Sequence, residues 1–216
     1  VLLTLIAWLW LASACNLCVV LSKKWIKVLL GINLLIVAIS PFFYYGIDSL
    51  EETLVLFTQQ MRYFGGISAF FIGGAIVLAT FNAKKSETPH AIKAAVFLSI
   101  ILFGYGGGLG YMISGVNVTI PAHYHGSIVS MTLAFMGLVY FLLPQLGFRK
   151  PTGKMLTLQP YIYGVGQAMH ITGLAWMGGY GALRKAPGTS QSIDTIAGKM
   201  LFFSGGVLAI IGGLLF

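Results

Sequence analysis

Two histidines stand two positions apart in an apolar stretch: His123 and His125, in VNVTIPAHYHGSIVSM. Neutral imidazole binds metal ions and is a common axial ligand of haem iron. Residues two apart on an α-helix point about 200° apart. The two rings therefore face nearly opposite sides of one helix, so they cannot grip one small ion, but each can serve a different large cofactor. The alternative, one interfacial and one packing histidine bonded to carbonyl groups, stays open.

Two further histidines have different surroundings. His170 lies in the apolar stretch YGVGQAMHITGLAW, about ten residues, or about 15 Å, from the outer end of its expected helix. At that depth it is expected to be poorly placed to complete the same iron, although a tilted helix could narrow the gap. A hydrogen-bonding core role is favoured, and ligand and quinone contact stay open. His90, in SETPHAIK, follows Pro89 at an expected helix start and is expected to be a solvated loop residue.

Glycines and a basic pair flank the histidines. The run GYGGGLGYMISG, residues 104–115, precedes the pair. Glycine lets a helix or a flat ring approach a backbone closely, although helix packing alone would explain the run. Arg184 and Lys185, in GGYGALRKAPG, are typical of charge beside a membrane and also lie where haem propionates would need cations. Cys15 and Cys18 lie in apolar sequence, which favours packing over redox or metal chemistry.

The composition places these residues in a membrane. The chain has 216 residues, of which 57% are hydrophobic and 8% charged, whereas soluble domains have roughly 25% charged residues. A soluble class is excluded, and the net charge of +8 is no sign of nucleic-acid binding. The chain opens on Val1 rather than on a methionine, which leaves open whether residues precede it.

Apolar segments predict the fold class. About 20 apolar residues span the hydrocarbon layer as a helix. We therefore predict an all-α integral membrane bundle of seven transmembrane helices, forming a single domain over residues 1–216. The expected segments are Leu2–Leu21, Ile26–Gly46, Phe64–Phe81, Ala94–Ile113, Thr119–Leu146, Leu158–Gly179 and Ile196–Phe216.

The distribution of basic residues predicts the orientation. Loops after the first, third and fifth segments hold nine basic residues, and those after the second, fourth and sixth hold four. Because cytoplasmic loops carry the excess of Lys and Arg, residue 1 is expected outside and the C-terminus in the cytoplasm. The histidine pair then enters from the outer side. The nine are Lys23, Lys24, Lys27, Lys84, Lys85, Lys93, Arg149, Lys150 and Lys154.

Taken together, these features resemble the catalytic subunit of haem–copper oxygen reductases, the cytochrome c oxidase subunit I family. Similar to that family's ninth and tenth helices is the run FLSIILFGYGGGLGYMISGVNVTIPAHYHGSIVSMTLAFMGLVYFLLPQLGF, in which a glycine-rich helix leads into a His-aromatic-His motif. The resemblance implies that His123 binds the haem at the oxygen site and that His125 binds the low-spin haem. It also implies that Arg184 and Lys185 contact haem propionates. The seven segments then match the family's helices six to twelve.

The resemblance fails at the copper site. The family's sixth helix carries a histidine and a cross-linked tyrosine, but LIAWLWLASACNLCVVL has neither. Its seventh helix carries adjacent histidines, but AISPFFYYG places Phe42 and Phe43 there, and phenylalanine offers no lone pair to a metal. The proton-channel lysine is also missing; RYFGGISAFF has Arg62 near the outer end instead. The second axial histidine of the low-spin haem comes from an early helix that this chain does not contain. Copper and catalytic residues are therefore not expected.

The sequence thus predicts a haem-binding membrane subunit of a respiratory electron-transfer complex, a degenerate relative of cytochrome c oxidase subunit I. One or two haems are expected, with iron held by His123 and His125 and with Arg184, Lys185 and His170 as further cofactor contacts. The haem type is left open.

Other membrane subunits of an oxidoreductase complex are the expected partners, and one of them would supply the missing axial ligand. Cytochrome c and quinone stay open as partners, and nucleic acid is not expected. The expected location is a bacterial, archaeal or mitochondrial inner membrane. Two alternatives stay open: a cofactor-free structural subunit, and a part of an active oxygen or nitric oxide reductase completed by another chain.

Overall fold

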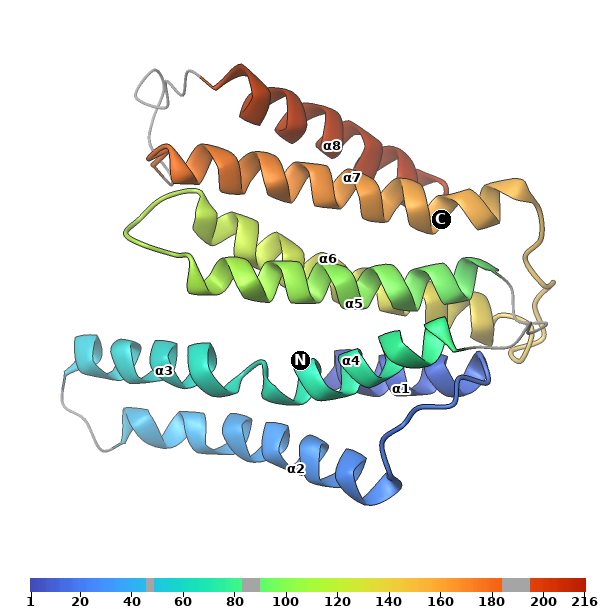
Figure 1. Cartoon of the computed structure of the whole chain (residues 1–216), viewed down its shortest axis with the longest axis horizontal. Helices are drawn as coiled ribbons and strands as arrows, with labels where there is room; N and C mark the ends of the chain where they lie inside the picture. The colour runs from blue at the N-terminus through green and yellow to red at the C-terminus, as the bar shows by residue number, and fades with distance from the viewer. Residues whose placement is uncertain (46–48, 83–89, 184–194) are drawn as a thin grey trace. The chain divides into compact units, whose positions relative to one another are not determined.

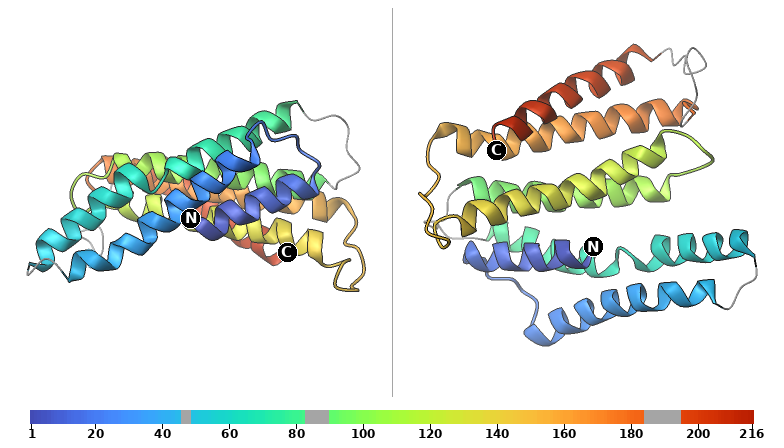
Figure 2. Two further views of the ribbon diagram at one scale, coloured as in Figure 1. Left: turned by 90° about the horizontal axis from the view of Figure 1, so that it is seen from below. Right: turned by 180° about the vertical axis from the view of Figure 1, so that it is seen from behind.

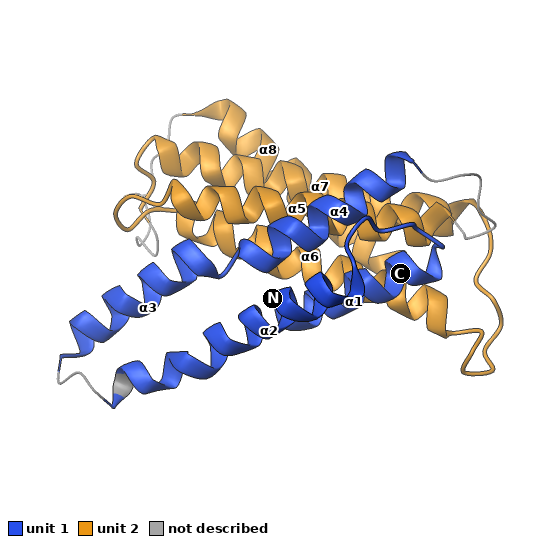
Figure 3. Cartoon of the chain, turned by 60° about the horizontal axis from the view of Figure 1, so that its bottom comes forward, with its two compact units in different colours: residues 1–86 blue, residues 87–216 orange. Residues whose placement is uncertain are grey.

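The computed structural model describes residues 1–45, 49–82, 90–183 and 195–216. The regular elements within these residues are helices (Figure 1). They divide between two compact units, Val1–Ser86 and Glu87–Phe216 (Figure 3). The elements are α1 (Leu2–Ala14), α2 (Lys23–Ile39), the 3-10 helix η1 (Ser40–Tyr44), α3 (Leu50–Phe64), α4 (Ile67–Phe81), α5 (His90–Tyr111), α6 (Thr119–Leu142), α7 (Lys154–Gly179) and α8 (Ile196–Leu214).

Within the described residues, five helical stretches are long and apolar enough to cross a membrane. The chain is therefore an all-helical protein with the character of a membrane protein. Each of the seven expected segments contains a helix, but α1 has 13 residues, fewer than the roughly 20 that span the hydrocarbon layer, and α7 is not among the five stretches. The count of seven crossings stays a prediction. The five stretches are Lys23–Phe43, Leu50–Phe81, His90–Tyr111, Thr119–Leu142 and Ile196–Leu214.

Helix α3 occupies a stretch where the apolar pattern predicts a loop, so that prediction is wrong. The Ser49 hydroxyl accepts a hydrogen bond from the Glu52 backbone N–H at 3.4 Å. A serine followed three residues later by a glutamate is a known signal for a helix start. Glu51 and Glu52 lie in the first turn and Arg62 in the last, where each charge complements the helix dipole.

The first unit is held together by side chains that bond to backbone carbonyls of α2. The Ser68 hydroxyl of α4 donates to the Leu29 carbonyl at 2.7 Å. The Gln60 side-chain amide of α3 donates to the Ile36 carbonyl at 2.9 Å. These contacts hold α3 and α4 against α2 without any charged side chain.

The two cysteines lie beyond the end of α1. The prediction places both in the first membrane segment as packing residues. Cys15 is buried, as a packing role requires, whereas Cys18 is exposed.

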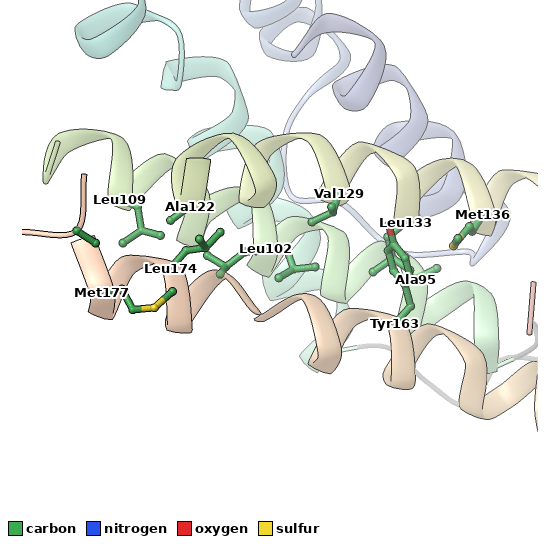
Figure 4. Close-up of a cluster of buried hydrophobic side chains, with 12 residues drawn as sticks. Ala95, Leu102, Leu109, Ala122, Val129, Leu133, Met136, Tyr163, Leu174 and Met177 are labelled. Atoms are coloured by element: carbon green, nitrogen blue, oxygen red, sulfur yellow. The ribbon is translucent and has the colours of Figure 1, made fainter. Parts of the chain in front are cut away.

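In the second unit α5 lies beside α6, and α7 lies beside α8 (Figures 1 and 2). Buried side chains of α5, α6 and α7 meet in one apolar cluster (Figure 4). It includes Leu102 and Leu109 of α5, Leu133 of α6, and Leu174 and Met177 of α7. This cluster fixes the three helices that carry the glycine-rich run and the histidines.

Helices α7 and α8 meet backbone to backbone along a row of glycines. Gly198, Gly205 and Gly212 are spaced by seven residues on α8, a repeat that stays on one face of a helix packed against a partner. A Cβ added at Gly212 would lie 2.5 Å from the Tyr163 nitrogen of α7. Small residues allow such close approach between helices in a membrane.

Replacing Gly212 by alanine is expected to destabilise the protein by about 1–3 kcal/mol, because the added methyl group has no room against α7. Thermal unfolding in detergent should show a lower Tm. The neighbouring Gly213→Ala is the matched control, since no heavy atom of the described chain lies within 4 Å of a Cβ at that position. Equal Tm values for the two variants would contradict the close approach.

A buried amide joins three helices near Gly212. Gln159 of α7 is fully buried. Its side-chain oxygen accepts from the Tyr140 hydroxyl of α6 at 3.0 Å, and its nitrogen donates to the Gly212 carbonyl of α8 at 2.8 Å. A buried polar group without such partners would cost about 1–3 kcal/mol. The bonds therefore fix the relative register of α6, α7 and α8.

Candidate functional site: the histidines of α6 and α7

The start of α6 positions the histidine pair. The Asn117 side-chain oxygen accepts from the Thr119 backbone N–H at 3.0 Å, which satisfies one of the amide groups that a helix start leaves open. Pro121 lies in the first turn, where its missing N–H costs nothing. The Val118 N–H donates to the Ala182 carbonyl at 2.9 Å. The chain is thus anchored just before His123.

His123 points to α5. Its Nδ1 lies 2.7 Å from the Gly106 carbonyl oxygen. A carbonyl only accepts, so Nδ1 carries the proton in this bond and Nε2 carries the lone pair. Metal-binding histidines commonly donate their other ring N–H to a carbonyl in this way. His123 is therefore held in the tautomer that leaves Nε2 able to bind a metal.

Two glycines of α5 make this orientation possible. A Cβ added at Gly106 would lie 2.7 Å from the Gly126 Cα of α6, so the two backbones are in contact there. One turn later, a Cβ at Gly110 would lie 2.9 Å from both Nδ1 and Cε1 of His123. The glycine-rich run thus serves helix packing at Gly106 and makes room for an imidazole at Gly110. The sequence prediction does not single out Gly110, although its spacing of four from Gly106 places both on one helix face.

Changing Gly110 to alanine is expected to displace the His123 ring and break its bond to Gly106. The haem that the sequence predicts at His123 should then bind about tenfold or more weakly, as for other changes to the groups that orient a ligand. Titrating haem into purified variants measures this. Gly108→Ala is the control, because a Cβ there meets no heavy atom of the described chain within 4 Å. Equal haem binding by both variants would count against a role for His123.

His125 points to a different neighbour, as the helical spacing predicts. Its ring centre lies 5.1 Å from that of His170 of α7, with the ring planes at 78°. The His170 Nδ1 lies 3.0 Å from the Phe202 carbonyl oxygen of α8, and its ring stacks on the Phe202 ring at 4.4 Å. By the same reasoning as for His123, Nδ1 of His170 carries the proton and Nε2 carries the lone pair.

The sequence places His170 deeper than the histidine pair, but in the structure its ring lies beside that of His125; the expectation that it does not complete the same iron stays a prediction. A Cβ added at Gly178 would lie 2.6 Å from the Thr119 nitrogen, so the last turn of α7 lies beside the first residue of α6. His170 is eight residues before Gly178 and His125 is six residues after Thr119. That difference corresponds to about 3 Å of depth, which the two side chains can bridge.

The remaining predicted site residues lie elsewhere. Arg184 and Lys185 fall outside the described residues, so their proposed contact with propionates stays a prediction. His90 is exposed and is the first residue of α5, close to its expected role at a helix start. Near His170 on α7, the Thr172 hydroxyl lies 3.0 Å from the Tyr105 hydroxyl of α5.

These features define an all-helical protein with the character of a membrane protein, which carries three imidazoles on two neighbouring helices, α6 and α7. The chain is 33% identical over 201 residues to an uncharacterized protein, RP382, of Rickettsia prowazekii (strain Madrid E); the match covers 74% of this chain and 39% of that protein.

A second relative is an uncharacterized protein of Aquifex aeolicus (strain VF5). It is 33% identical over 69 residues, which cover 32% of this chain and 18% of that protein. The chain thus spans about two fifths or less of the length of the curated relatives that it matches. No family model and no solved structure matches the chain.

Proposed function

We propose that the chain is a haem-binding membrane subunit of a respiratory electron-transfer complex, derived from a scaffold like that of cytochrome c oxidase subunit I. One observation carries the proposal: Nδ1 of His123 bonds to the Gly106 carbonyl at 2.7 Å, which leaves the Nε2 lone pair of this imidazole available for a metal. Ionisable side chains inside a membrane-spanning helix are costly and usually functional.

The types of donor present support haem as the cofactor. His123 would bind the iron of one haem through Nε2, and His125, which leaves α6 toward α7, would bind the iron of a second. Arg184 and Lys185 would pair with propionates near the outer end of α7. Bound haem would supply one-electron transfer, with a potential set by the axial ligands and their hydrogen bonds. The chain's own part is to hold the imidazoles in fixed tautomers and to exclude water with its apolar helices.

The charge distribution supports an orientation with residue 1 outside and Phe216 in the cytoplasm of an inner membrane. In that orientation, His123 and His125 lie toward the outer side. The second axial ligand of the haem at His125 would come from another subunit, or from the part of a longer protein that lies outside this chain. Both curated relatives are much longer than the stretch that they share with this chain.

The test is the optical spectrum and haem extraction of the complex purified from its native membrane with the full-length chain in place. We expect a reduced-minus-oxidised haem spectrum and at least one haem per chain. A complex whose histidines contact only protein or water would instead identify a structural subunit. Stoichiometric copper or non-haem iron beside His123 would identify a reductase and overturn the electron-transfer proposal.

A further inference from the structure

We infer that the first unit binds a monovalent cation such as Na⁺ between α2 and the break that separates α3 from α4. The side-chain oxygen of Asn33 and the backbone carbonyls that the break leaves without hydrogen bonds are its ligands. The histidines belong to the other unit, so this inference goes beyond the proposed function and does not rest on haem.

The break between α3 and α4 leaves backbone carbonyls unpaired. The two helices follow one another along the chain and are separated by Gly65 and Gly66 (Figures 1 and 3). The Gly65 N–H still donates to the Met61 carbonyl at 3.1 Å, and the helical bonds resume where the Phe70 N–H donates to the Gly66 carbonyl at 2.9 Å. Three carbonyls in between accept no hydrogen bond from the described part of the chain: those of Tyr63, Phe64 and Gly65.

This break lies in the middle of an apolar stretch. Helices α3 and α4 have 15 residues each, and together they form the stretch Leu50–Phe81, which is long and apolar enough to cross a membrane. Unpaired backbone groups are costly in hydrocarbon. Membrane proteins use the carbonyls of such broken helices, near the middle of the bilayer, to bind ions.

Asn33 of α2 is a second, independent sign of a bound group. The residue is 2% exposed, and its Oδ1 has no hydrogen-bond partner in the part of the chain that the structure describes. It is the central residue of the apolar stretch Lys23–Phe43, with ten residues on either side. A buried amide oxygen without a donor is unfavourable. Its oxygen therefore indicates a cation or a donor that belongs there.

Contacts between the helices place Asn33 opposite the break. The Ser68 hydroxyl of α4 donates to the Leu29 carbonyl at 2.7 Å. The Gln60 amide of α3 donates to the Ile36 carbonyl at 2.9 Å. Because Asn33 lies about midway between the two acceptors, it is about level with the break, which lies between the two donors. Leu29 and Asn33 are the buried residues of α2 and are four apart, so their side chains share one face of the helix.

The charges around the break favour a monovalent ion. The carboxylates of α3, Glu51 and Glu52, lie in its first turn, and Glu52 is 13 residues before Gly65, or about 20 Å. Divalent cations usually take carboxylate ligands, whereas neutral carbonyl oxygens bind K⁺ and Na⁺. Arg62 lies close to the break, but it follows Gln60 by two residues and so points about 200° away from it and from α2.

Thermal unfolding of the purified full-length protein in detergent tests the inference, with NaCl compared against choline chloride at equal ionic strength. An ion that binds only the folded state raises its stability. With Na⁺ about 100-fold above its Kd, we expect the wild-type Tm to rise by about 5–10 °C. KCl is a third arm that shows which of the two ions the site prefers. Equilibrium binding of radioactive Na⁺ counts the ions per chain.

Asn33→Leu should abolish the rise in Tm and remove one bound ion per chain. Leucine is similar in size to asparagine and leaves no oxygen unpaired, so in choline chloride the variant should unfold at or above the wild-type Tm. This result separates loss of the ion from loss of the fold. Asn82→Leu is the matched control, since Asn82 is an exposed asparagine just after α4, and it should keep the full response to Na⁺.

Asn33→Asp decides the outcome if Asn33→Leu does not fold. A carboxylate in place of the amide should bind Na⁺ at least tenfold more tightly, because it adds a negative charge in a medium of low dielectric constant. The inference is overturned if the wild-type Tm is the same in NaCl, KCl and choline chloride, since water or the Asn33 amide nitrogen then satisfies the carbonyls. An unchanged Na⁺ response in Asn33→Leu, or an unchanged Kd in Asn33→Asp, also overturns it. The haem spectrum should be the same in every Asn33 variant, so the proposed function is tested separately.

Discussion

On the proposed function, we expect His125→Ala to remove one haem from the purified complex and His123→Ala to remove another, which is the largest effect that we expect. The two imidazoles leave α6 toward α5 and toward α7, so each would serve a separate iron. Changes to groups that only orient a ligand cost about 10–100-fold in metal affinity, and loss of the ligand itself should cost at least as much. Haem extraction and difference spectra of each variant measure the loss.

His90→Ala is the matched control for this experiment. His90 is an exposed histidine of the same unit, at the start of α5, so its removal should leave the spectrum unchanged. The double variant His123→Ala, His125→Ala should lose both bands. If the two single variants lose one and the same band, the separate roles of the two imidazoles are wrong. If neither variant loses a haem band, the assignment of His123 and His125 as iron ligands is wrong.

Replacing Gly126 by leucine is expected to have the largest effect on stability. A Cβ at this position would collide with the Gly106 Cα of α5, where backbone faces backbone. Neither partner has a side chain that can move aside, so the helices must separate. We expect the free energy of unfolding to fall by about 3 kcal/mol or more, at the upper end of the range for overpacking. Thermal or denaturant unfolding in detergent measures this cost.

Gly104→Leu is the matched control, because Gly104 is exposed on α5 and a Cβ there meets no heavy atom of the described chain within 4 Å. It should unfold at the wild-type midpoint. A Gly126→Leu variant that unfolds with the control would show that α5 and α6 do not meet at these glycines. In the destabilised variant the His123 bond to Gly106 should also be lost, because that bond spans the same two helices.

The opposed directions of His123 and His125 could be predicted from the sequence, because the angle between two residues on one helix follows from helix geometry alone. Apolar runs also locate most of the helices: α6 and α8 begin where the expected segments begin. Helix α3 has its own signal in Ser49 and Glu52, which the search for apolar runs passes over since the stretch carries charge.

The closeness of His125 and His170 could not be predicted in the same way. It depends on the relative height of α6 and α7, which is fixed by the contact of Gly178 with Thr119 and by the bond from Val118 to Ala182. Both contacts join residues far apart in the sequence and neither follows a helical period. Within a single helix the pattern is local, but the alignment of two helices is set by contacts at their ends.

The touching backbones of Gly106 and Gly126 have a mechanical consequence. A flexible side chain between two helices can change rotamer and let the helices slide. At Gly106 and Gly126 no side chain separates α5 from α6. We therefore expect α5 and α6 to tilt or shift together. A displacement of α5 would therefore be passed on to α6 and to the His123 ring, whose bond to Gly106 joins the same two helices.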